Sequence, residues 1–413
     1  MSALPSDPRM PHDTRTEGAE PKVPSESLPA AAHEPAAVRA GADASETTAP
    51  ADPRVRQSRR GHGRVTLREV AAAAGVTSIT VSRFLREPQV VAEDTAQRIR
   101  QALLNSGYVP NKQAGGLASG SSKVVAALLP NLANSIFAET AQGLSHTLQA
   151  AGHELLITST GYSLEREEDQ LRALLGWHPA AVVVTGRRHS AGAMAMLATA
   201  QARGTPVIEI WDCHPEADEP AARANANLRF TQVGFNHDDV GRAMAQHLLA
   251  AGHRRLAYVD SGVAEDYRAH ERGLAFAAQA RAAGAQVRRM IAPQGDPFDA
   301  GRQMLDALLT PSVTGRAPIT AAAFANDHLA CGALLQAVQH GVPVPGRLAL
   351  LGFGDFALSR QLQPALSSVA LPRVEIGVSA ARALLRALDG DHSREQVELA
   401  WQLCPRASTA SRS

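Results

Sequence analysis

A short segment near the N-terminus combines side chains that can read DNA base edges. Within six positions stand three hydroxyls, one isoleucine and one guanidinium: Ser78, Ile79, Thr80, Ser82 and Arg83. Hydroxyls donate to phosphates, arginine pairs with guanine O6 and N7, and isoleucine contacts a thymine methyl. Just upstream, six arginines and no acidic residue lie between Arg54 and Arg68, and such a run neutralises phosphates. The pattern indicates a helix laid in a major groove. A helical bundle with a polar face and a solvated basic tail is the alternative.

A second set of polar and aromatic residues stands where apolar runs end in the rest of the chain. In proteins built from parallel strands, ligands bind beyond the carboxyl ends of the strands. We therefore expect a small-molecule site to draw on this set: Asn134, Ser135, Phe137, Arg187, His189, Glu209, Trp211, Asn236, Arg268, His270, Asn326 and Asp327. At each position a solvent-facing loop residue is the alternative.

Two further motifs could indicate catalysis or metal binding, and neither has the context that it needs. Residues 352–357 (GFGDFA) fit the dinucleotide pattern G-x-G-x-x-A, but they come at the end of the fold without an acidic residue placed for a ribose. Residues 237–239 (HDD) indicate a helix start with acidic first-turn residues rather than a metal site. Three widely spaced cysteines form no metal or disulfide pattern. We expect no enzyme, no cofactor and no bound metal.

Three short helices must position the DNA-reading face. Thr66 and Glu69 have the capping-box spacing that begins a helix, Gly75 ends that helix, and Thr77 can cap the next. A third helix is expected over residues 93–107. Two helices joined by a glycine-centred turn make a helix-turn-helix. The hydroxyls of both caps, Thr66 and Thr77, are also expected to contact the DNA.

The chain from residue 123 onward alternates short apolar runs with helical stretches. The expected strands are 124–129, 154–159, 181–185, 206–210, 255–260, 320–325 and 347–352, and helices are expected at 136–150, 164–175, 240–250 and 328–340. Such alternation predicts parallel sheets covered on both faces. Some 290 residues are too many for one sheet, so we expect two similar α/β lobes.

These patterns divide the chain into four parts. We expect a disordered, basic-ended tail over 1–60, a helix-turn-helix domain over 61–107, a hinge over 108–122 and a two-lobed ligand-binding and dimerisation domain over 123–413. The tail lacks the apolar residues needed to offset its chain entropy. Residues 1–52 contain no apolar run as long as that of a signal peptide. No apolar stretch elsewhere reaches the roughly 18 residues that span a bilayer. A cytoplasmic protein without membrane contact is therefore expected.

The N-terminal pattern has a specific resemblance. The run VTLREVAAAAGVTSITVSRFL, followed by YVPN at 108–111 and AGGLA at 114–118, resembles the headpiece and hinge of the lactose-repressor (LacI/GalR) family. The resemblance implies that the second helix enters the major groove. Ser78 and Ile79 would then set operator preference, with Arg83 as a further base contact.

The same resemblance implies a role for the hinge, which would contribute Asn111, Ala114 and Leu117 to DNA binding. In the family the hinge folds into a helix on the operator, and a leucine, here Leu117, wedges into the minor groove and bends the duplex. One departure is the glycine pair at 115–116, since each glycine disfavours helix by about 1 kcal/mol relative to alanine. Folding of this hinge into a helix should therefore require more free energy than in family members without the glycine pair.

The remainder of the chain resembles periplasmic sugar-binding proteins, and LLPNLANSIFAE, GYSLEREEDQL and VVTGRRHS most resemble gluconate-utilisation repressors. The family commonly has Gly-Phe-Asp-Asp after a late strand, and its first aspartate bonds sugar hydroxyls, whereas this chain has Gly354 there. Losing that carboxylate while keeping Arg187 and His189 favours an anionic ligand. The resulting hypothesis is a sugar acid such as gluconate or its phosphate.

The resemblance implies a homodimeric repressor of palindromic double-stranded operator DNA, because a two-fold pair of headpieces reads such a site. No leucine heptads follow Arg406, so no tetramer is expected. Ligand would close the lobes, separate the hinges and lower DNA affinity. Three alternatives stay open: a neutral sugar or other metabolite as effector, activation instead of repression, and a solute-binding protein, against which the headpiece argues.

Overall fold

The computed structural model describes residues 65–110, 122–132, 136–213, 230–310 and 318–410. The chain divides after Arg64 into two units, and every element described below belongs to the second, Val65–Ser413. The predicted tail and most of the predicted hinge lie outside the described residues. So do five predicted site residues: Asn111, Ala114, Leu117, Asn134 and Ser135.

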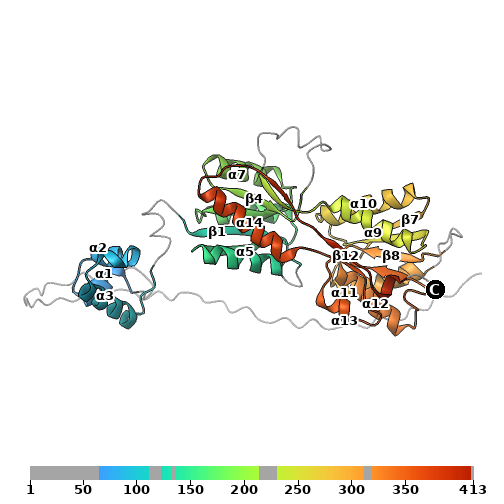
Figure 1. Ribbon diagram of the computed structural model, residues 1–413, viewed down its shortest axis with the longest axis horizontal. Helices are drawn as coiled ribbons and strands as arrows, with labels where there is room; N and C mark the ends of the chain where they lie inside the picture. The colour runs from blue at the N-terminus through green and yellow to red at the C-terminus, as the bar shows by residue number, and fades with distance from the viewer. Residues whose placement is uncertain (1–64, 111–121, 133–135, 214–229, 311–317, 411–413) are drawn as a thin grey trace, which may run out of the picture. The chain divides into compact units, whose positions relative to one another are not determined.

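The N-terminal helices form the predicted helix-turn-helix (Figure 1). They are α1 (Leu67–Ala74), α2 (Ser78–Arg86) and α3 (Glu93–Ser106), with the 3-10 turn η1 (Pro88–Val90) between the last two. The capping box is present: Glu69 N donates to Thr66 Oγ1 at 3.3 Å, and Thr66 N donates to Glu69 Oε2 at 2.7 Å. Gly75 follows α1 at φ 65°, a conformation that glycine adopts without strain. Thr77 caps α2.

A small core holds these helices together. Its buried residues come from all three helices: Val70, Ala71, Ala74, Val81, Phe84, Ala96, Ile99 and Ala102. Each helix presents one apolar stripe at helical spacing, so the three stripes meet and the remaining faces stay polar. The core therefore fixes which side of α2 is turned outward.

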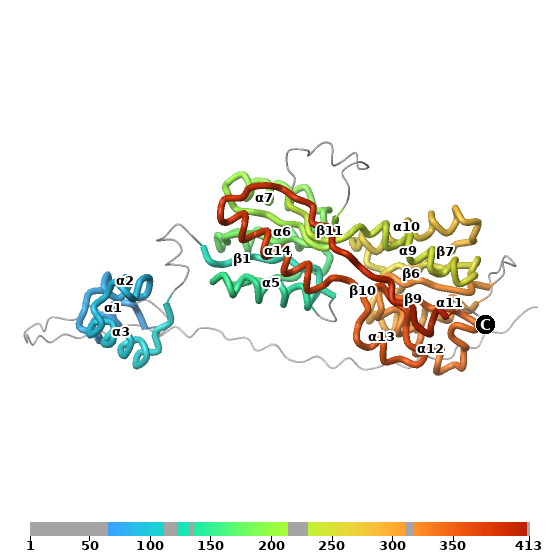
Figure 2. The backbone as a smooth tube through the Cα atoms, viewed as in Figure 1, coloured from blue at the N-terminus to red at the C-terminus, as the bar shows by residue number. Residues whose placement is uncertain are grey.

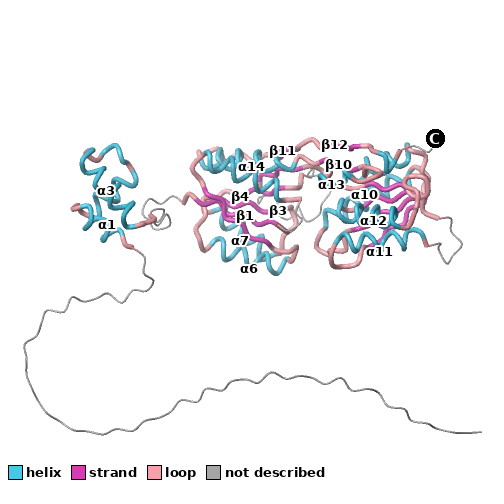
Figure 3. Tube along the Cα trace, turned by 90° about the horizontal axis from the view of Figure 1, so that it is seen from below, coloured by secondary structure: helices cyan, strands magenta, loops and turns pink. Residues whose placement is uncertain are grey.

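The first lobe, here the N-lobe, contains a six-stranded sheet in the order β11-β5-β4-β3-β1-β2, with every pair parallel. Its strands are β1 (Val124–Leu129), β2 (Glu154–Ser159), β3 (Ala181–Thr185), β4 (Val207–Ile210), β5 (Thr231–Gly234) and β11 (Gln396–Glu398). Helices α5 (Ala138–Ala150) and α14 (Arg373–Leu388) cover one face, and α6 (Leu164–Leu175) and α7 (Ala191–Ala202) cover the other (Figure 3). Coverage on both faces explains the nearly all-apolar central strands.

The second lobe, the C-lobe, repeats this plan around a four-stranded parallel sheet in the order β7-β6-β8-β9. Its strands are β6 (Arg255–Asp260), β7 (Gln286–Ile291), β8 (Ala321–Phe324) and β9 (Ala349–Leu351). Helices α9 (His237–Ala250) and α10 (Tyr267–Ala282) pack on the sheet as one pair and α11 (Pro297–Leu309) and α12 (Asp327–Gln339) as another, with α13 (Ala357–Gln361) beside α12. Two lobes of parallel α/β structure were predicted, and the structure confirms them.

Five strands were not predicted. Strand β7 contains two arginines and stands at a sheet edge, so it lacks the apolar pattern of a central strand. Strand β5 follows a segment outside the described residues, and β10 (Ser368–Ala370), β11 and β12 (Gln402–Cys404) have three residues each. Strands this short exist because distant partners pair with them: β10 is antiparallel to β12, and β11 is parallel to β5.

The chain passes between the lobes three times. It leaves the N-lobe after β5, returns from β10 to α14, and crosses again between β11 and β12 before the 3-10 turn η2 (Ala407–Thr409) (Figure 2). Each lobe is therefore built from non-contiguous segments. Among the described helices, none is long and apolar enough to cross a membrane.

Candidate functional site

The outward face of α2 carries the residues predicted to contact DNA. Val81 and Phe84 turn into the core, whereas Ile79 is 77% exposed and Arg83 is exposed. An exposed isoleucine adds nothing to the core, so its position fits contact with a partner surface such as a thymine methyl. Thr80 is partly engaged already, since its hydroxyl lies 2.9 Å from that of Thr77 in the cap. Ser78 and Ser82 are half-buried on the same helix.

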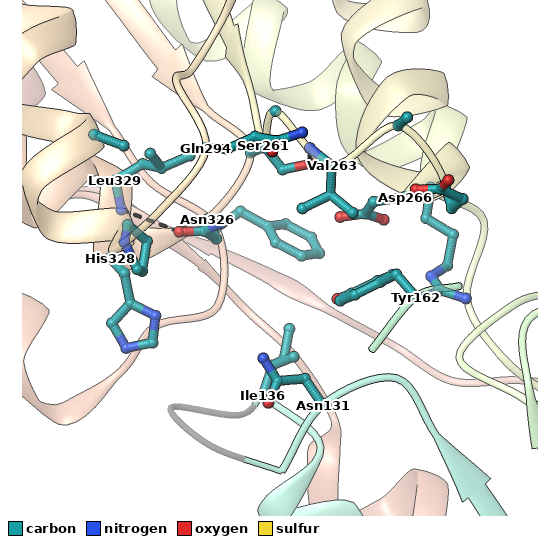
Figure 4. Close-up of a pocket in the computed structure, with 18 of the residues that line it drawn as sticks. Asn131, Ile136, Tyr162, Ser261, Val263, Asp266, Gln294, Asn326, His328 and Leu329 are labelled. Carbon is teal, nitrogen blue, oxygen red and sulfur yellow. Dashed lines mark hydrogen bonds between the residues drawn. The ribbon is translucent and has the colours of Figure 1, made fainter. Parts of the chain in front are cut away.

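A cavity of about 520 Å³ lies between the lobes, a volume typical of small-molecule sites. Residues from both lobes line it, and most stand just beyond the carboxyl ends of strands. The N-lobe contributes Asn131, Ile136, Phe137, Tyr162 and Trp211, and the C-lobe contributes Ser261, Val263, Asp266, Arg268, Arg272, Gln294, Asn326, His328, Leu329, Phe353 and Phe356, among others. In Figure 4, Asn131 and Ile136 lie on one side of the cavity and Asn326, His328 and Leu329 on another.

Aromatic rings form one wall of the cavity. Phe137 meets Trp211 edge-on at 5.1 Å between ring centroids, and Trp211 meets the buried Phe235 at 6.0 Å. Trp211 and Tyr162 both adopt left-handed backbone conformations, with φ of 69° and 67°. Such conformations cost of order 1 kcal/mol or more for non-glycine residues and concentrate at ligand sites. The indole Nε1 of Trp211 is buried without a hydrogen-bond partner among the described residues.

Two buried arginines stand one helical turn apart on α10. Arg268 and Arg272 are 6% and 3% exposed. Arg272 donates to His237 Nδ1 at 2.9 Å and to the carbonyl oxygen of Ala325 at 2.9 Å, and its guanidinium lies 3.7 Å from the centre of the Phe353 ring. None of these partners is a carboxylate. Its Nε is buried without a partner among the described residues.

His237 connects these two groups. Because Arg272 can only donate, His237 Nδ1 accepts, so Nε2 carries the hydrogen and donates to the Trp211 carbonyl oxygen at 2.9 Å. Burial, and next the positive charge of Arg272, hold the pKa of His237 well below its ordinary value. The imidazole is therefore neutral, and it ties the end of β4 in the N-lobe to α10 in the C-lobe.

Known proteins match both parts of this arrangement. Residues 66–111 match the family described as bacterial regulatory proteins, lacI family, and residues 245–409 match a periplasmic binding protein-like domain. The HTH-type transcriptional regulator GntR of Pseudomonas aeruginosa is 38% identical over 352 residues, which cover 84% of this chain and 96% of that protein. The chain belongs to the LacI family. As predicted, it is a DNA-binding transcriptional repressor of that family.

Solved structures agree with this membership. A LacI-family transcriptional regulator from Silicibacter pomeroyi is 32% identical, has a TM-score of 0.74, and matches 84% of this chain and 99% of its own. A crystal structure of the lac repressor dimer bound to operator and an anti-inducer, 21% identical with a TM-score of 0.70, shows the same LacI-family fold. The relatives are transcriptional regulators, and no cluster of three metal-binding side chains occurs among the described residues of this LacI-family chain.

Of the residues predicted to bind the LacI-family effector, four line the cavity: Phe137, Trp211, Arg268 and Asn326. Asn326 also caps α12, with its Oδ1 accepting from Leu329 N at 3.0 Å (Figure 4). The other six described candidates do not line it. Asn236 caps α9, and Asp327 is fully buried, where it accepts from the hydroxyls of Ser359 and Ser368.

The charged candidates that lie outside the cavity have protein partners of their own. Arg187 pairs with Asp212 and Glu271. His189 Nδ1 lies 2.6 Å from Glu167, and its Nε2 lies 3.6 Å from Glu209. His270 has a side chain that is 56% exposed, and it accepts from Arg289. Arg187 and His189 therefore cannot support the argument for an anionic ligand, because neither lines the cavity. The arginines that line it are Arg268 and Arg272.

The sequence reasoning missed Arg272, Tyr162 and His237. A signal for Arg272 was present: it stands four residues after Arg268, so the two share a face of one helix, whereas His270 is two residues away and faces elsewhere. Tyr162 follows a predicted strand by three residues and could have been added on that ground. His237 gave no signal, since its role depends on contacts with Trp211 and Arg272.

Proposed function

We propose that this LacI-family repressor senses a sugar acid, of which gluconate is the first candidate, in the cavity between its lobes. The observation that carries the proposal is Arg272: a buried guanidinium at the cavity whose hydrogen bonds go to a neutral imidazole and a carbonyl oxygen. A buried cation without a carboxylate partner is costly, and a bound anion would offset that cost. The Phe353 ring under Arg272 compensates only in part.

Other groups at the cavity suit the rest of such a ligand. Asn131, Gln294 and Asn326 have amides that can bond hydroxyls in either direction, and the free Nε1–H of Trp211 can donate to an oxygen. Gly354 stands where the family commonly has an aspartate, so no carboxylate at that position would repel an acid. A polyol with one carboxylate fits this mixture.

The competing candidate is a neutral sugar. Asp266 lines the cavity, and carboxylates bond sugar hydroxyls well. However, one oxygen of Asp266 already caps α10 by accepting from Ala269 N at 3.3 Å, which leaves less of this carboxylate for a ligand.

On the DNA side, we propose that two copies read a palindromic operator, with Ile79, Arg83 and the hydroxyls of α2 in the major groove and Leu117 in the minor groove. A dimer suits the two-fold symmetry of such a site. The ligand must prefer the state that cannot bind DNA, so operator must weaken ligand binding by the same factor. A protein that reads chromosomal operators would act in the cytoplasm.

Calorimetric titration tests the proposal. Gluconate, 6-phosphogluconate, other sugar acids and neutral sugars are titrated into the purified protein, with and without a palindromic operator selected from random duplexes. Saturable binding of a sugar acid that weakens when operator is present is the expected result. Equal affinity for glucose and gluconate would refute the acid specificity, and operator binding without any response to these compounds would leave the repressor but remove the sugar acid.

A further inference from the structure

Five residues outside the cavity join the two lobes directly. Arg187 and Arg188 follow β3 and Asp212 follows β4 in the N-lobe, whereas Tyr267 and Glu271 stand on the first two turns of α10 in the C-lobe. We call this set the interlobe clasp. None of its members lines the cavity, although Arg268 and Arg272 on the same helix do.

Glu271 receives both arginines. Arg187 binds it in a fork, with Nη2 donating to Oε1 at 2.8 Å and Nη1 to Oε2 at 3.1 Å, and Arg188 Nη2 donates to Oε1 at 2.7 Å. The Arg187 and Glu271 side chains are only 10% and 13% exposed. Forked, desolvated arginine–carboxylate pairs are among the strongest polar contacts in proteins, because water competes poorly for them.

Tyr267 makes a second connection. Its hydroxyl accepts from Arg187 N at 2.7 Å and donates to Asp212 Oδ2 at 2.5 Å. The guanidinium groups of Arg187, Arg188 and Arg268 lie 5.3, 4.9 and 5.2 Å from the centre of its ring. The phenol therefore links both strand ends of the N-lobe to α10, and it holds a cavity arginine at the same time.

Gly186 makes this close approach of the lobes possible. It has φ of 86°, and a Cβ at this position would lie 2.5 Å from the Tyr267 hydroxyl and would also overlap Nη1 of Arg268. A larger residue would be strained at this φ and would have to displace the Tyr267 hydroxyl and the Arg268 guanidinium. The backbone before Arg187 thus touches the C-lobe because it has no side chain there.

We infer that the interlobe clasp sets effector affinity from outside the cavity, by holding the lobes together and fixing Arg268 at the cavity wall. The inference rests on the proposed function. A ligand that touches both lobes binds only when they are together, so its apparent affinity contains the free energy of bringing them together. Contacts that already hold the lobes reduce this cost and strengthen binding without touching the ligand.

The test compares two carboxylates that each form a buried pair. Glu271→Gln removes a charge that joins the lobes, whereas Glu167→Gln removes a charge whose partner, His189, lies in the same lobe. Tyr267→Phe is a milder second variant that keeps the ring and removes only the two hydroxyl contacts. Circular dichroism and thermal unfolding establish that all three variants fold.

The first readout needs no ligand. Trp211 is 2% exposed at the cavity and next to Asp212, so opened lobes should make its fluorescence easier to quench with acrylamide. The measurement uses a Trp177→Phe, Trp401→Phe background, which leaves Trp211 as the single tryptophan. Glu271→Gln and Tyr267→Phe should raise the quenching constant, and Glu167→Gln should not.

The second readout is gluconate affinity by calorimetry. We expect Glu271→Gln to weaken it by about tenfold or more, Tyr267→Phe by a smaller factor, and Glu167→Gln by less than twofold. Unchanged quenching of Trp211 in Glu271→Gln would overturn the clasp, and raised quenching with unchanged gluconate affinity would overturn its role in binding. If the parent protein binds no sugar acid, the proposed function fails while the quenching still decides whether the clasp holds the lobes.

Discussion

Two histidines show how strongly single side chains depend on their immediate neighbours. His189 lies between the carboxylates of Glu167 and Glu209, and His237 lies beside Arg272. Burial by itself would lower the pKa of both imidazoles, because it disfavours the charged form. At His189 the hydrogen bond with Glu167 and the negative charges of Glu167 and Glu209 outweigh burial and raise the pKa to about 9, whereas at His237 the arginine lowers the pKa further. One histidine is therefore a structural cation and the other a neutral connector.

The raised pKa of His189 predicts a specific loss of stability in alkali. The stabilisation is complete below the unfolded pKa of about 6.5 and disappears as pH rises through about 9, because the folded state then loses the proton that it had favoured. His189→Gln should lower the melting temperature at pH 6.5, and the difference from the parent protein should shrink towards pH 10. A difference that stays constant over this range would contradict a charged His189.

Arg272 gives the residue-scale prediction for the ligand. Arg272→Met keeps much of the volume over the Phe353 ring and removes the charge, so gluconate affinity should fall by about 10- to 100-fold. His270→Ala on the same helix is the matched control, since its exposed side chain lies outside the cavity, and it should change affinity little. Calorimetry with gluconate and glucose separates charge from packing: equal losses for both sugars would assign Arg272 a packing role.

At the scale of the element, helix α2 has one face buried in the headpiece core and one face exposed. Val81 is fully buried in the headpiece core, and Ile79, two residues earlier, is 77% exposed. Helical geometry turns positions two apart by about 200°, so one substitution can test the core and the other the outward face. In each of the two helices α1 and α2, the capping side chain and the backbone N–H that it binds are three residues apart, so the start of each helix is specified locally.

Substitutions at Ile79 and Val81 should therefore affect different properties, operator binding for Ile79 and headpiece stability for Val81. Ile79→Ala should weaken operator binding by about 5- to 100-fold, the cost of losing a contact at one base pair, and leave the melting of the headpiece unchanged. Val81→Ala should destabilise the headpiece by about 2 kcal/mol because it leaves a cavity. Fluorescence anisotropy with labelled operator and thermal unfolding give the two readings. An Ile79→Ala protein with parental operator affinity would remove Ile79 from the interface.

At the scale of the whole molecule, three chain crossings and the interlobe clasp make the cavity, which is the proposed effector site, a joint property of the two lobes. The strands of both sheets end at the cavity, so a ligand there bears on their relative position. The proposed response to a small molecule requires that ligand and operator prefer different arrangements of the two lobes.

A substitution at the proposed wedge residue, Leu117, should separate operator binding from ligand binding. Leu117→Ala should weaken operator binding, because the smaller side chain cannot hold a base step open, and it should leave gluconate affinity in the absence of DNA nearly unchanged. Anisotropy and calorimetry on the same preparation measure both. Parental operator affinity in the variant would refute the wedge.

Local features of the sequence determined the headpiece and the general plan of the body. The capping box at Thr66, the turn at Gly75 and the cap at Thr77 act through neighbours within a few residues, so they could be recognised without a fold. The apolar runs of the buried parallel strands likewise predict an α/β body, and their ends predict where a ligand site lies. Phe137, Trp211, Arg268 and Asn326, which line the cavity, were selected from the sequence in this way.

Tertiary structure alone decided which charges face the cavity. Arg187 and His189 follow a strand as a ligand contact would, but Glu271 from the other lobe and Glu167 from α6 hold them elsewhere. The short strands β10, β11 and β12 likewise exist only through pairing with distant segments. A strand end specifies where a side chain starts. The direction in which the side chain points depends on partners that lie tens to hundreds of residues away, and their contacts form only when the lobes do.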